Sequence, residues 1–181
     1  FLTDENIGPG RVAVAMILAA AAVHTHLVRV GLRSYSSVNV RSAECLDTHY
    51  FAVLIGVGAT TVNAYLTAAG IEDRHARGLL GGMDLATAKG NYRNSINEGL
   101  LKIMSKMGIS TVASYRAGQL FEAIGLSHQI VDLCFKGVPS RIEGARFTDL
   151  ENDQKKLAAD AWKTRRPIDQ GGLLKFVFNK E

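Results

Sequence analysis

A long apolar segment near the start of the chain places the strongest constraint on its fold. Residues 12–23 are mostly alanine with other apolar residues, and this run is well short of the roughly 20 residues that a membrane-spanning helix needs. After the turn signal Gly8-Pro9-Gly10, apolar residues recur at helical spacing until Gly31, a residue that commonly ends helices. We therefore predict a largely buried helix over residues 11–30, with other elements covering it.

The composition agrees with a folded protein that can supply this cover. Hydrophobic residues make up 47% of the 181 residues, and 21 Lys and Arg against 17 Asp and Glu give a net charge of +4, which excludes a disordered or collagen-like chain. The length indicates one domain or pieces of two. The basic residues are scattered except for Lys163, Arg165 and Arg166, so we expect neither a nucleic-acid partner nor a membrane partner.

Two features at the level of the whole chain bear on its location and extent. Cys45 and Cys134 are too few for a zinc site or a secreted disulfide framework, which favours a reducing cytoplasm. The sequence begins at Phe1 without a basic segment, so we expect no signal peptide. The chain has the character of an excerpt from a longer protein.

The remaining pattern predicts an α/β protein. Residues 49–57 suit a buried helix or a buried strand, and periodicity alone does not choose between them. Residues 69–90 are rich in glycine, which indicates a connection around short helices and the place of any domain boundary. The other predicted elements, in order, are a strand over 34–40, a short helix capped by Thr60 or Thr61, a helix over 91–107 ended by Gly108, a strand over 109–113, a turn over 114–118, the start of a helix over 119–124, a helix over 129–135 capped by Ser127, an irregular stretch over 137–140, an amphipathic helix over 148–162 ended by Pro167, Gly171 and Gly172, and a strand over 173–178.

Several residues suggest chemistry, and most have a simpler structural explanation. His24, His26 and His49 are possible metal ligands, but residues two apart on a helix point to different faces, so we favour histidines that hydrogen-bond near a helix end. Gly56-Val57-Gly58 lacks the third glycine of a dinucleotide-binding fingerprint, and the later glycines lack the Lys-Ser/Thr of a phosphate loop. Cys134 lies among apolar residues, which predicts an inert core thiol.

The most informative stretch surrounds the predicted strand over 109–113. Residues 99–119 gather Lys, Ser, Thr, Tyr, Arg and Gln after a glycine, and polar groups at strand ends of α/β proteins often hold ligand oxygens. Ser and Tyr at strand ends also serve turns, so the residues leave a ligand site and a structural loop as alternatives.

Several blocks of sequence are long or unusual in composition. They are VHTHLVR at 23–29, HYFAVLIG at 49–56, KIMSKMGIST at 102–111, SYR at 114–116, FEAIGL at 121–126, SRIEG at 140–144 and QGGLLK at 170–175. In these blocks, which fall in family order over nearly the whole chain, the sequence closely resembles the large subunit of glutamate synthase, most of all the bacterial NADPH-dependent form.

The resemblance implies a fold, a reaction and a set of cofactors. Residues 1–90 would close a central α/β domain, and residues 91–181 would open an FMN-binding (β/α)8 barrel that is incomplete in this fragment. The family is an oxidoreductase of nitrogen assimilation that makes glutamate from glutamine and 2-oxoglutarate: ammonia passes through an internal tunnel, and reduced FMN delivers hydride to 2-iminoglutarate. The whole enzyme would also carry a three-iron iron–sulfur cluster, FAD and NADPH, and a small NADPH-oxidising flavoprotein subunit.

Little of that machinery is expected within this chain. The amidotransferase cysteine, the three cluster cysteines and the later barrel strands are missing, so we expect no catalytic residue and no metal ligand. The resemblance to a flavin barrel makes Met107, Gly108, Ser110, Thr111 and Ser114 the candidate FMN contacts, through backbone groups and the Ser110 and Thr111 hydroxyls. Tyr115 and Arg116 are weaker candidates, since Arg116 could instead pair with a carboxylate across a domain interface. The alternative is a noncatalytic scaffold that packs domains together and lines the ammonia tunnel.

Overall fold

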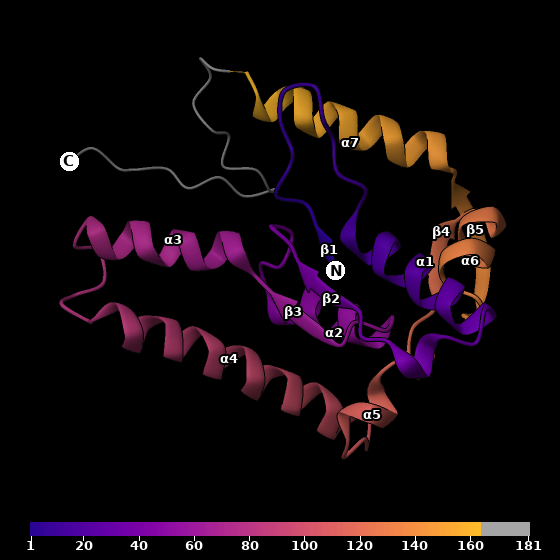
Figure 1. Ribbon diagram of the computed structural model, residues 1–181, viewed down its shortest axis with the longest axis horizontal. Helices are drawn as coiled ribbons and strands as arrows, with labels where there is room; N and C mark the ends of the chain where they lie inside the picture. The colour runs from indigo at the N-terminus through magenta and orange to yellow at the C-terminus, as the bar shows by residue number, and fades with distance from the viewer. Residues whose placement is uncertain (164–181) are drawn as a thin grey trace, which may run out of the picture.

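The computed structural model describes residues 1–163, and both helices and strands occur along it (Figure 1). The elements in chain order are β1 (Leu2–Thr3), α1 (Met16–Arg29), the 3-10 helix η1 (Arg33–Tyr35), β2 (Asn39–Arg41), α2 (Thr48–Gly56), β3 (Thr61–Asn63), α3 (Tyr65–Ala76), α4 (Leu85–Lys106), α5 (Val112–Tyr115), β4 (Ala123–Leu126), α6 (His128–Cys134), β5 (Ser140–Ala145) and α7 (Phe147–Ala161). The predicted α/β class is confirmed, with small parallel sheets.

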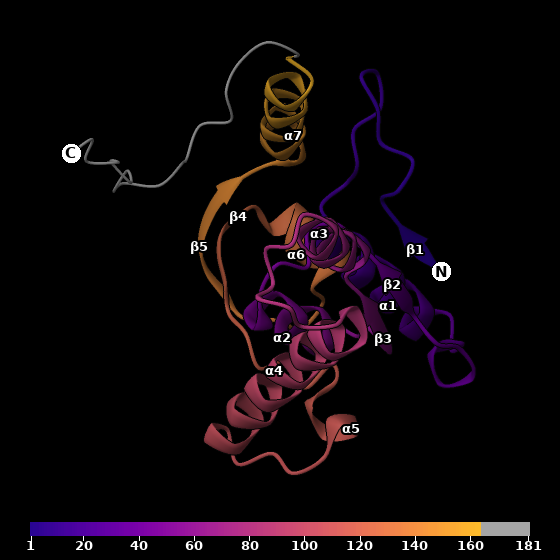
Figure 2. The same cartoon turned by 90° about the vertical axis from the view of Figure 1, so that its left-hand side faces the viewer.

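The strands form two separate parallel sheets (Figure 2). The first has the order β1-β2-β3, with Leu2 opposite Val40 and Asn39 opposite Thr61. The second pairs β4 with β5, and α6 lies between these two strands in the chain. A helix that connects two parallel neighbouring strands is the usual crossover unit of α/β proteins.

Helix α1 is the element that joins the two parts of the molecule. Its first backbone N–H, that of Met16, donates to the Glu44 carboxylate at 2.9 Å, and it ends before Gly31, which has a φ of 71°. Ala20 is buried in the core beside the first sheet, whereas its neighbour Ala21 is buried against α6. The predicted helix over 11–30 is confirmed with a later start, because the chain from Gly8 to Arg11 makes a closed turn instead.

Helices α2 and α4 each begin with an aspartate cap. The Asp47 side chain accepts a hydrogen bond from the Tyr50 N–H at the start of α2, and Asp84 accepts one from the Thr87 N–H at the start of α4. Such caps satisfy backbone donors that have no partner within a helix. Residues 49–57 are thus a helix, and the predicted helix end at Gly108 is confirmed with a φ of 69°.

The structure corrects the prediction of a helix capped by Thr60 or Thr61. Residues Thr61–Asn63 form β3, and helix α3 starts only at Tyr65 after Ala64. The Thr60 N–H donates to the Val38 carbonyl at 2.7 Å, so pairing with the preceding strand decides the local conformation. The predicted strand over 34–40 is correct only at its end, where β2 begins at Asn39, since Arg33–Tyr35 forms a 3-10 helix.

Three further predictions are wrong. Residues 109–113 are not a strand, because residues 108–111 form a loop and α5 begins at Val112. Residues 119–124 do not begin a helix but lead into β4, whose strand pairs with β5. The glycine-rich connection over 69–90 is much shorter, since α3 continues to Ala76 and α4 begins at Leu85. Pairing with the distant β5 explains β4, whereas α4 and α5 begin at the local caps Asp84 and Thr111.

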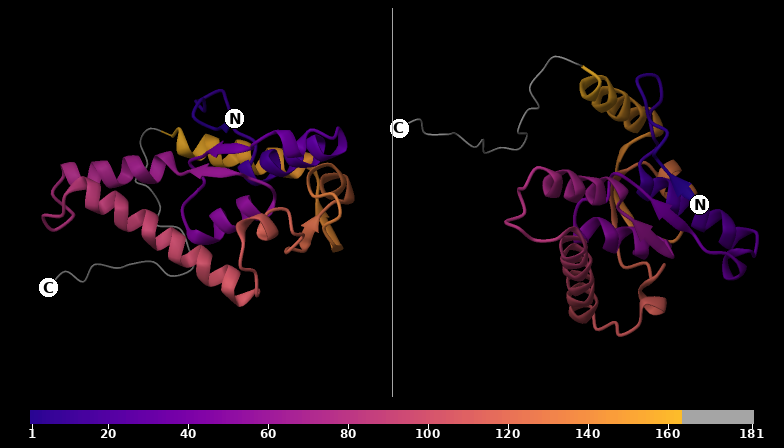
Figure 3. Two further views of the ribbon diagram at one scale, coloured as in Figure 1. Left: turned by 60° about the horizontal axis from the view of Figure 1, so that its bottom comes forward. Right: turned by 60° about the vertical axis from the view of Figure 1, so that its left-hand side comes forward.

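The final described helix, α7, lies on the opposite side of the first sheet from α4 (Figures 1 and 3). The predicted amphipathic helix over 148–162 is confirmed at Phe147–Ala161, but none of its residues is buried. Leu150 packs against the α1–α6 core while Leu157 is 64% exposed. The predicted stop at Pro167, Gly171 and Gly172 and the strand over 173–178 lie outside the described residues. No helix within residues 1–163 is long and apolar enough to span a membrane.

Candidate functional site

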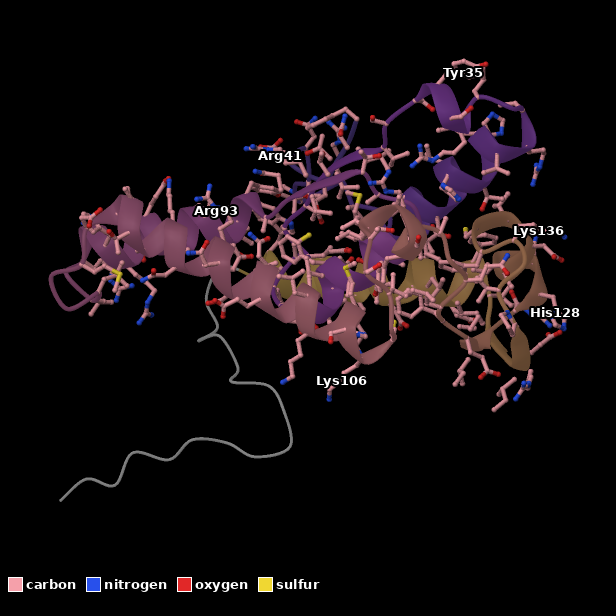
Figure 4. All side chains as sticks on the ribbon, turned by 90° about the horizontal axis from the view of Figure 1, so that it is seen from below. Tyr35, Arg41, Arg93, Lys106, His128 and Lys136 are labelled. Atoms are coloured by element: carbon pink, nitrogen blue, oxygen red, sulfur yellow. The ribbon has the colours of Figure 1, made fainter. Side chains whose placement is uncertain are left out.

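The predicted flavin segment is an exposed loop between α4 and α5. Met107 is 44% exposed, and Gly108, Ser110, Thr111 and Ser114 are exposed as well. Lys106 extends outward from the end of α4 (Figure 4). Residues 109–113 are not a strand, so this segment does not lie at a strand end. A flavin contact here rests on the family resemblance.

Hydrogen bonds within the loop occupy some of its polar groups. The Thr111 hydroxyl caps α5 by accepting from the Ser114 N–H, and the Thr111 and Ser114 hydroxyls lie 2.8 Å apart. Within residues 1–163 the N–H groups of Ser110 and Thr111 have no hydrogen-bond partner. The loop therefore offers backbone donors, and any wall enclosing a flavin would have to come from elsewhere.

A cleft of about 1060 Å³ lies between α1, α2, α6 and residues 117–124, and none of the candidate flavin residues lines it. Apolar side chains form most of its lining, and charged groups occur among them. The lining residues are Ile17, Ala21, His24, Thr25, Val28, Arg29, Val53, Gly56, Val57, Ala117, Gln119, Phe121, Glu122, Ala123, Ile124, Leu126, Asp132, Cys134, Phe135, Lys136 and Val138.

Arg33 does not line this cleft, but it holds His24, which does. Its guanidinium donates from Nε to His24 Nδ1 at 2.9 Å, from Nη1 to the Ser36 carbonyl at 2.6 Å and from Nη2 to the Gly58 carbonyl at 2.8 Å. Burial disfavours the imidazolium and Arg33 repels it, so the pKa of His24 is lowered. A neutral His24 whose Nδ1 accepts a hydrogen bond carries its proton on Nε2. Burial is the main cause that favours the neutral ring, and the bond from Arg33 fixes its tautomer.

Two glycines allow the chain to approach these groups closely. Gly58 has a φ of 117°, and a Cβ added there would lie 2.5 Å from the His24 ring. A Cβ added at Gly56 would lie 2.2 Å from Phe121 Cε2, and the Gly56 carbonyl accepts from the Ala117 N–H at 3.0 Å. The sequence pattern identified Gly56-Val57-Gly58 only as a turn, although two closely spaced glycines are also a signal of close approach.

The segment that follows Arg116 is held in an unusual backbone conformation. Ala117 and Gln119 have φ values of 57° and 52°. Residues other than glycine and asparagine seldom adopt this backbone region. Gln119 also packs against Gly137, where an added Cβ would lie 2.3 Å from Nε2. This conformation carries the chain from α5 past α2 into β4.

The other candidate ligands do not meet. His26 and His49 are exposed, and His24 is partly buried in its bond with Arg33. Within residues 1–163 no group of three or more His, Cys, Asp or Glu side chains could hold a metal ion. An exposed contact that the sequence pattern did not indicate joins His128 Nε2 to a Glu143 carboxylate oxygen at 2.7 Å.

The thiols are also unsuited to nucleophilic chemistry. Cys134 is 3% exposed, burial raises its pKa, and its carbonyl accepts from the Thr25 hydroxyl at 2.9 Å. Burial, with the nearby carboxylates, raises the pKa of Cys45 to about 12. The predicted core role of Cys134 is confirmed. With an apolar lining and no activated nucleophile, the cleft is suited to binding or packing rather than to covalent catalysis.

Comparison with known proteins gives a consistent result. The family described as "Glutamate synthase central domain" matches residues 1–127. The chain is 53% identical over 176 residues to the glutamate synthase [NADPH] large chain of Azospirillum brasilense, covering 97% of this chain and 12% of that protein. It is 38% identical to the corresponding large chain of Bacillus subtilis, covering 89% and 10% of the two chains. It is 42% identical to the ferredoxin-dependent glutamate synthase 2 of Synechocystis, covering 76% and 9%. The chain thus spans about a tenth of the length of these relatives.

Proposed function

Because this chain belongs to the glutamate synthase central-domain family, we propose that it works as part of a glutamate synthase large chain. The observation that carries the proposal is the 53% identity over 97% of the chain to a bacterial large chain. The assembled enzyme then makes glutamate from glutamine and 2-oxoglutarate in nitrogen assimilation. Its location is the cytoplasm, and its partners are the remaining domains and a small NADPH-oxidising flavoprotein subunit.

Within that enzyme the role best supported for this chain is a scaffold. Helix α1 is shared between two cores, with Ala20 in one and Ala21 in the other. Tyr115 and Met104 form a third core with Ala52 of α2. These contacts fix α6 and α5 against the first half of the chain, so movement of one part would displace the other. A scaffold that holds domains in register also fixes the course of an ammonia tunnel, and the cleft beside α1 supplies a mainly apolar wall.

We also propose where the barrel begins. The β4–α6–β5 crossover is the unit from which (β/α) barrels are built. The opening strand of the FMN domain would then be β4, which lies within the last residues of the central-domain match, 1–127. The domain division expected near residue 90 lies inside α4, so α4 would precede the barrel as one rigid element.

A flavin contact by Met107, Gly108, Ser110, Thr111 and Ser114 is the second candidate role. The unpartnered N–H groups of Ser110 and Thr111 support it, because backbone donors can approach a ligand without bulk. In the family's reaction, bound FMN would supply the hydride. The whole enzyme would also carry the three-iron cluster, FAD and NADPH. The part of this chain would be to hold and orient, with the loop closed by other domains.

Glutamine-dependent NADPH oxidation by the full-length protein, with glutamate as the product, tests the enzyme assignment. Absence of that activity in a flavin-loaded protein would contradict it. The two roles of this chain are separated by Ser110→Ala and Thr111→Val, with Lys106→Ala as the matched control at the same helix end. A flavin contact predicts a lower FMN content in the first two variants alone. Unchanged FMN content and activity in all three would leave the scaffold role.

A further inference from the structure

A second, smaller cleft lies between α1 and the residues around α5, and its lining includes positively charged side chains but, among the described residues, no acidic ones. Its volume is about 470 Å³, and it is lined by His24, Val28, Gly31, Arg33, Ser34, Ala113, Arg116 and Ala117. Two guanidinium groups therefore line one small cleft, and none of the described lining residues is acidic. Within residues 1–163 neither arginine takes part in an ion pair.

The hydrogen-bonding state of the two arginines leaves donors free. Arg33 uses one N–H on each of its three nitrogens, for His24, Ser36 and Gly58, so one N–H remains on each terminal nitrogen. Arg116 Nε is buried and has no partner among the residues that the structure describes. His24 adds the Nε2 proton that its bond with Arg33 requires.

Electrostatics make this arrangement unfavourable without an anion. Burial and the neighbouring charge of Arg116 lower the pKa of Arg33, which shows that the two like charges act on each other. A buried donor without a partner costs free energy, and the cost is larger for a charged group. A planar oxyanion placed between the guanidinium groups would remove the repulsion and would accept hydrogen bonds from their remaining terminal N–H groups.

We propose that the cleft between Arg33 and Arg116 binds a carboxylate group. The guanidinium fork matches a carboxylate in a two-bond geometry, and the remaining walls, Val28, Gly31, Ala113 and Ala117, suit the short hydrocarbon part of such a group. The carboxylate belongs either to an Asp or Glu side chain elsewhere in the full-length protein or to a free short-chain carboxylic acid. The inference goes beyond the proposed function. A protein carboxylate as the occupant rests on that function, because it requires the rest of the large chain, but the readout is hydrogen exchange rather than activity, so the two can fail separately.

The test uses the full-length protein, its Arg116→Met and Arg116→Lys variants, and Arg93→Met as a matched control. Arg93 is an exposed arginine on α4 (labelled in Figure 4) and does not line the cleft. Amide hydrogen exchange of residues 113–117 is followed by mass spectrometry in sodium acetate and in sodium chloride at equal ionic strength. The lysine variant keeps the charge and loses the fork, so it carries the test if the methionine variant does not fold.

A free carboxylate predicts slower exchange in acetate than in chloride for the unmodified protein and for Arg93→Met. In this case loss of the fork should weaken the acetate response roughly tenfold, since charged hydrogen bonds contribute about 1.5–3 kcal/mol. A protein carboxylate predicts no acetate response, but exchange roughly tenfold faster in both Arg116 variants than in Arg93→Met. Exchange that is indifferent to acetate and equal in the Arg116 and Arg93 variants would overturn the proposal.

Discussion

Replacing Gly58 with alanine should loosen the junction between α1 and the segment that follows α2. Two separate penalties arise at this residue. Its φ of 117° is a conformation that alanine rarely adopts, and the new Cβ would lie 2.5 Å from Cγ and Nδ1 of His24. That ring cannot turn away freely, because Arg33 holds Nδ1 and also donates to the Gly58 carbonyl.

The magnitude follows from adding these penalties. Forcing a residue with a Cβ into a sparsely populated backbone region costs about 1–3 kcal/mol, and overpacking a filled site costs about 1–3 kcal/mol more. The sum of about 2–6 kcal/mol is comparable with the whole stability of a marginal domain, about 5–15 kcal/mol. Because about 1.4 kcal/mol is a factor of ten, local opening should become at least roughly 30-fold more frequent.

Amide hydrogen exchange of the full-length protein measures this change at α1 and at residues 57–60. Gly31→Ala is the matched control, since Gly31 also has a positive φ, 71°, but an added Cβ would meet nothing within 4 Å. The control should show the backbone penalty alone and exchange more slowly than Gly58→Ala. Equal exchange in the two variants would refute the argument that close packing against His24 makes Gly58 necessary.

Three further expectations follow from the same geometry. Ala117→Gly should stabilise the protein by about 1 kcal/mol, because Ala117 has a φ of 57° and a residue with a Cβ is strained there; an unchanged melting temperature would contradict this. The pKa of His24 is lowered from its usual value of 6.5, so the unfolded state binds the proton more readily. The stability present above about pH 6.5 should therefore fall as the pH drops below it. His24→Gln should flatten this pH dependence in a series of melting curves. The chain expressed alone should neither fold cooperatively nor bind FMN tightly, because Ile124, Ile142 and Leu101 are 66%, 59% and 64% exposed and the two-stranded parallel sheet has unpaired edges; a sharp urea transition in Trp162 fluorescence with stoichiometric FMN uptake would show the opposite.

The sequence by itself determined the elements whose signals are local. The alanine-rich stretch after Gly8-Pro9-Gly10 specified α1, and periodic apolar residues followed by Gly108 specified the end of α4. Helical spacing and a left-handed glycine are properties of neighbouring residues, so they need no knowledge of the fold. The family resemblance was also contained in the sequence, in blocks that kept their order along the chain.

Tertiary structure alone decided strands β3 and β4 and the clefts. Residues 61–63 became β3 because β2 pairs with them, and residues 123–126 became β4 because β5 lies beside them; the opposite strand is remote in sequence, so no local pattern specifies it. The meeting of Arg33, His24 and Gly58, and of Arg33 with Arg116 across one cleft, likewise depends on α1, α2 and α5 packing together. Chemistry between distant residues is set by the three-dimensional path of the chain, and the sequence supplies only the groups that the path brings into contact.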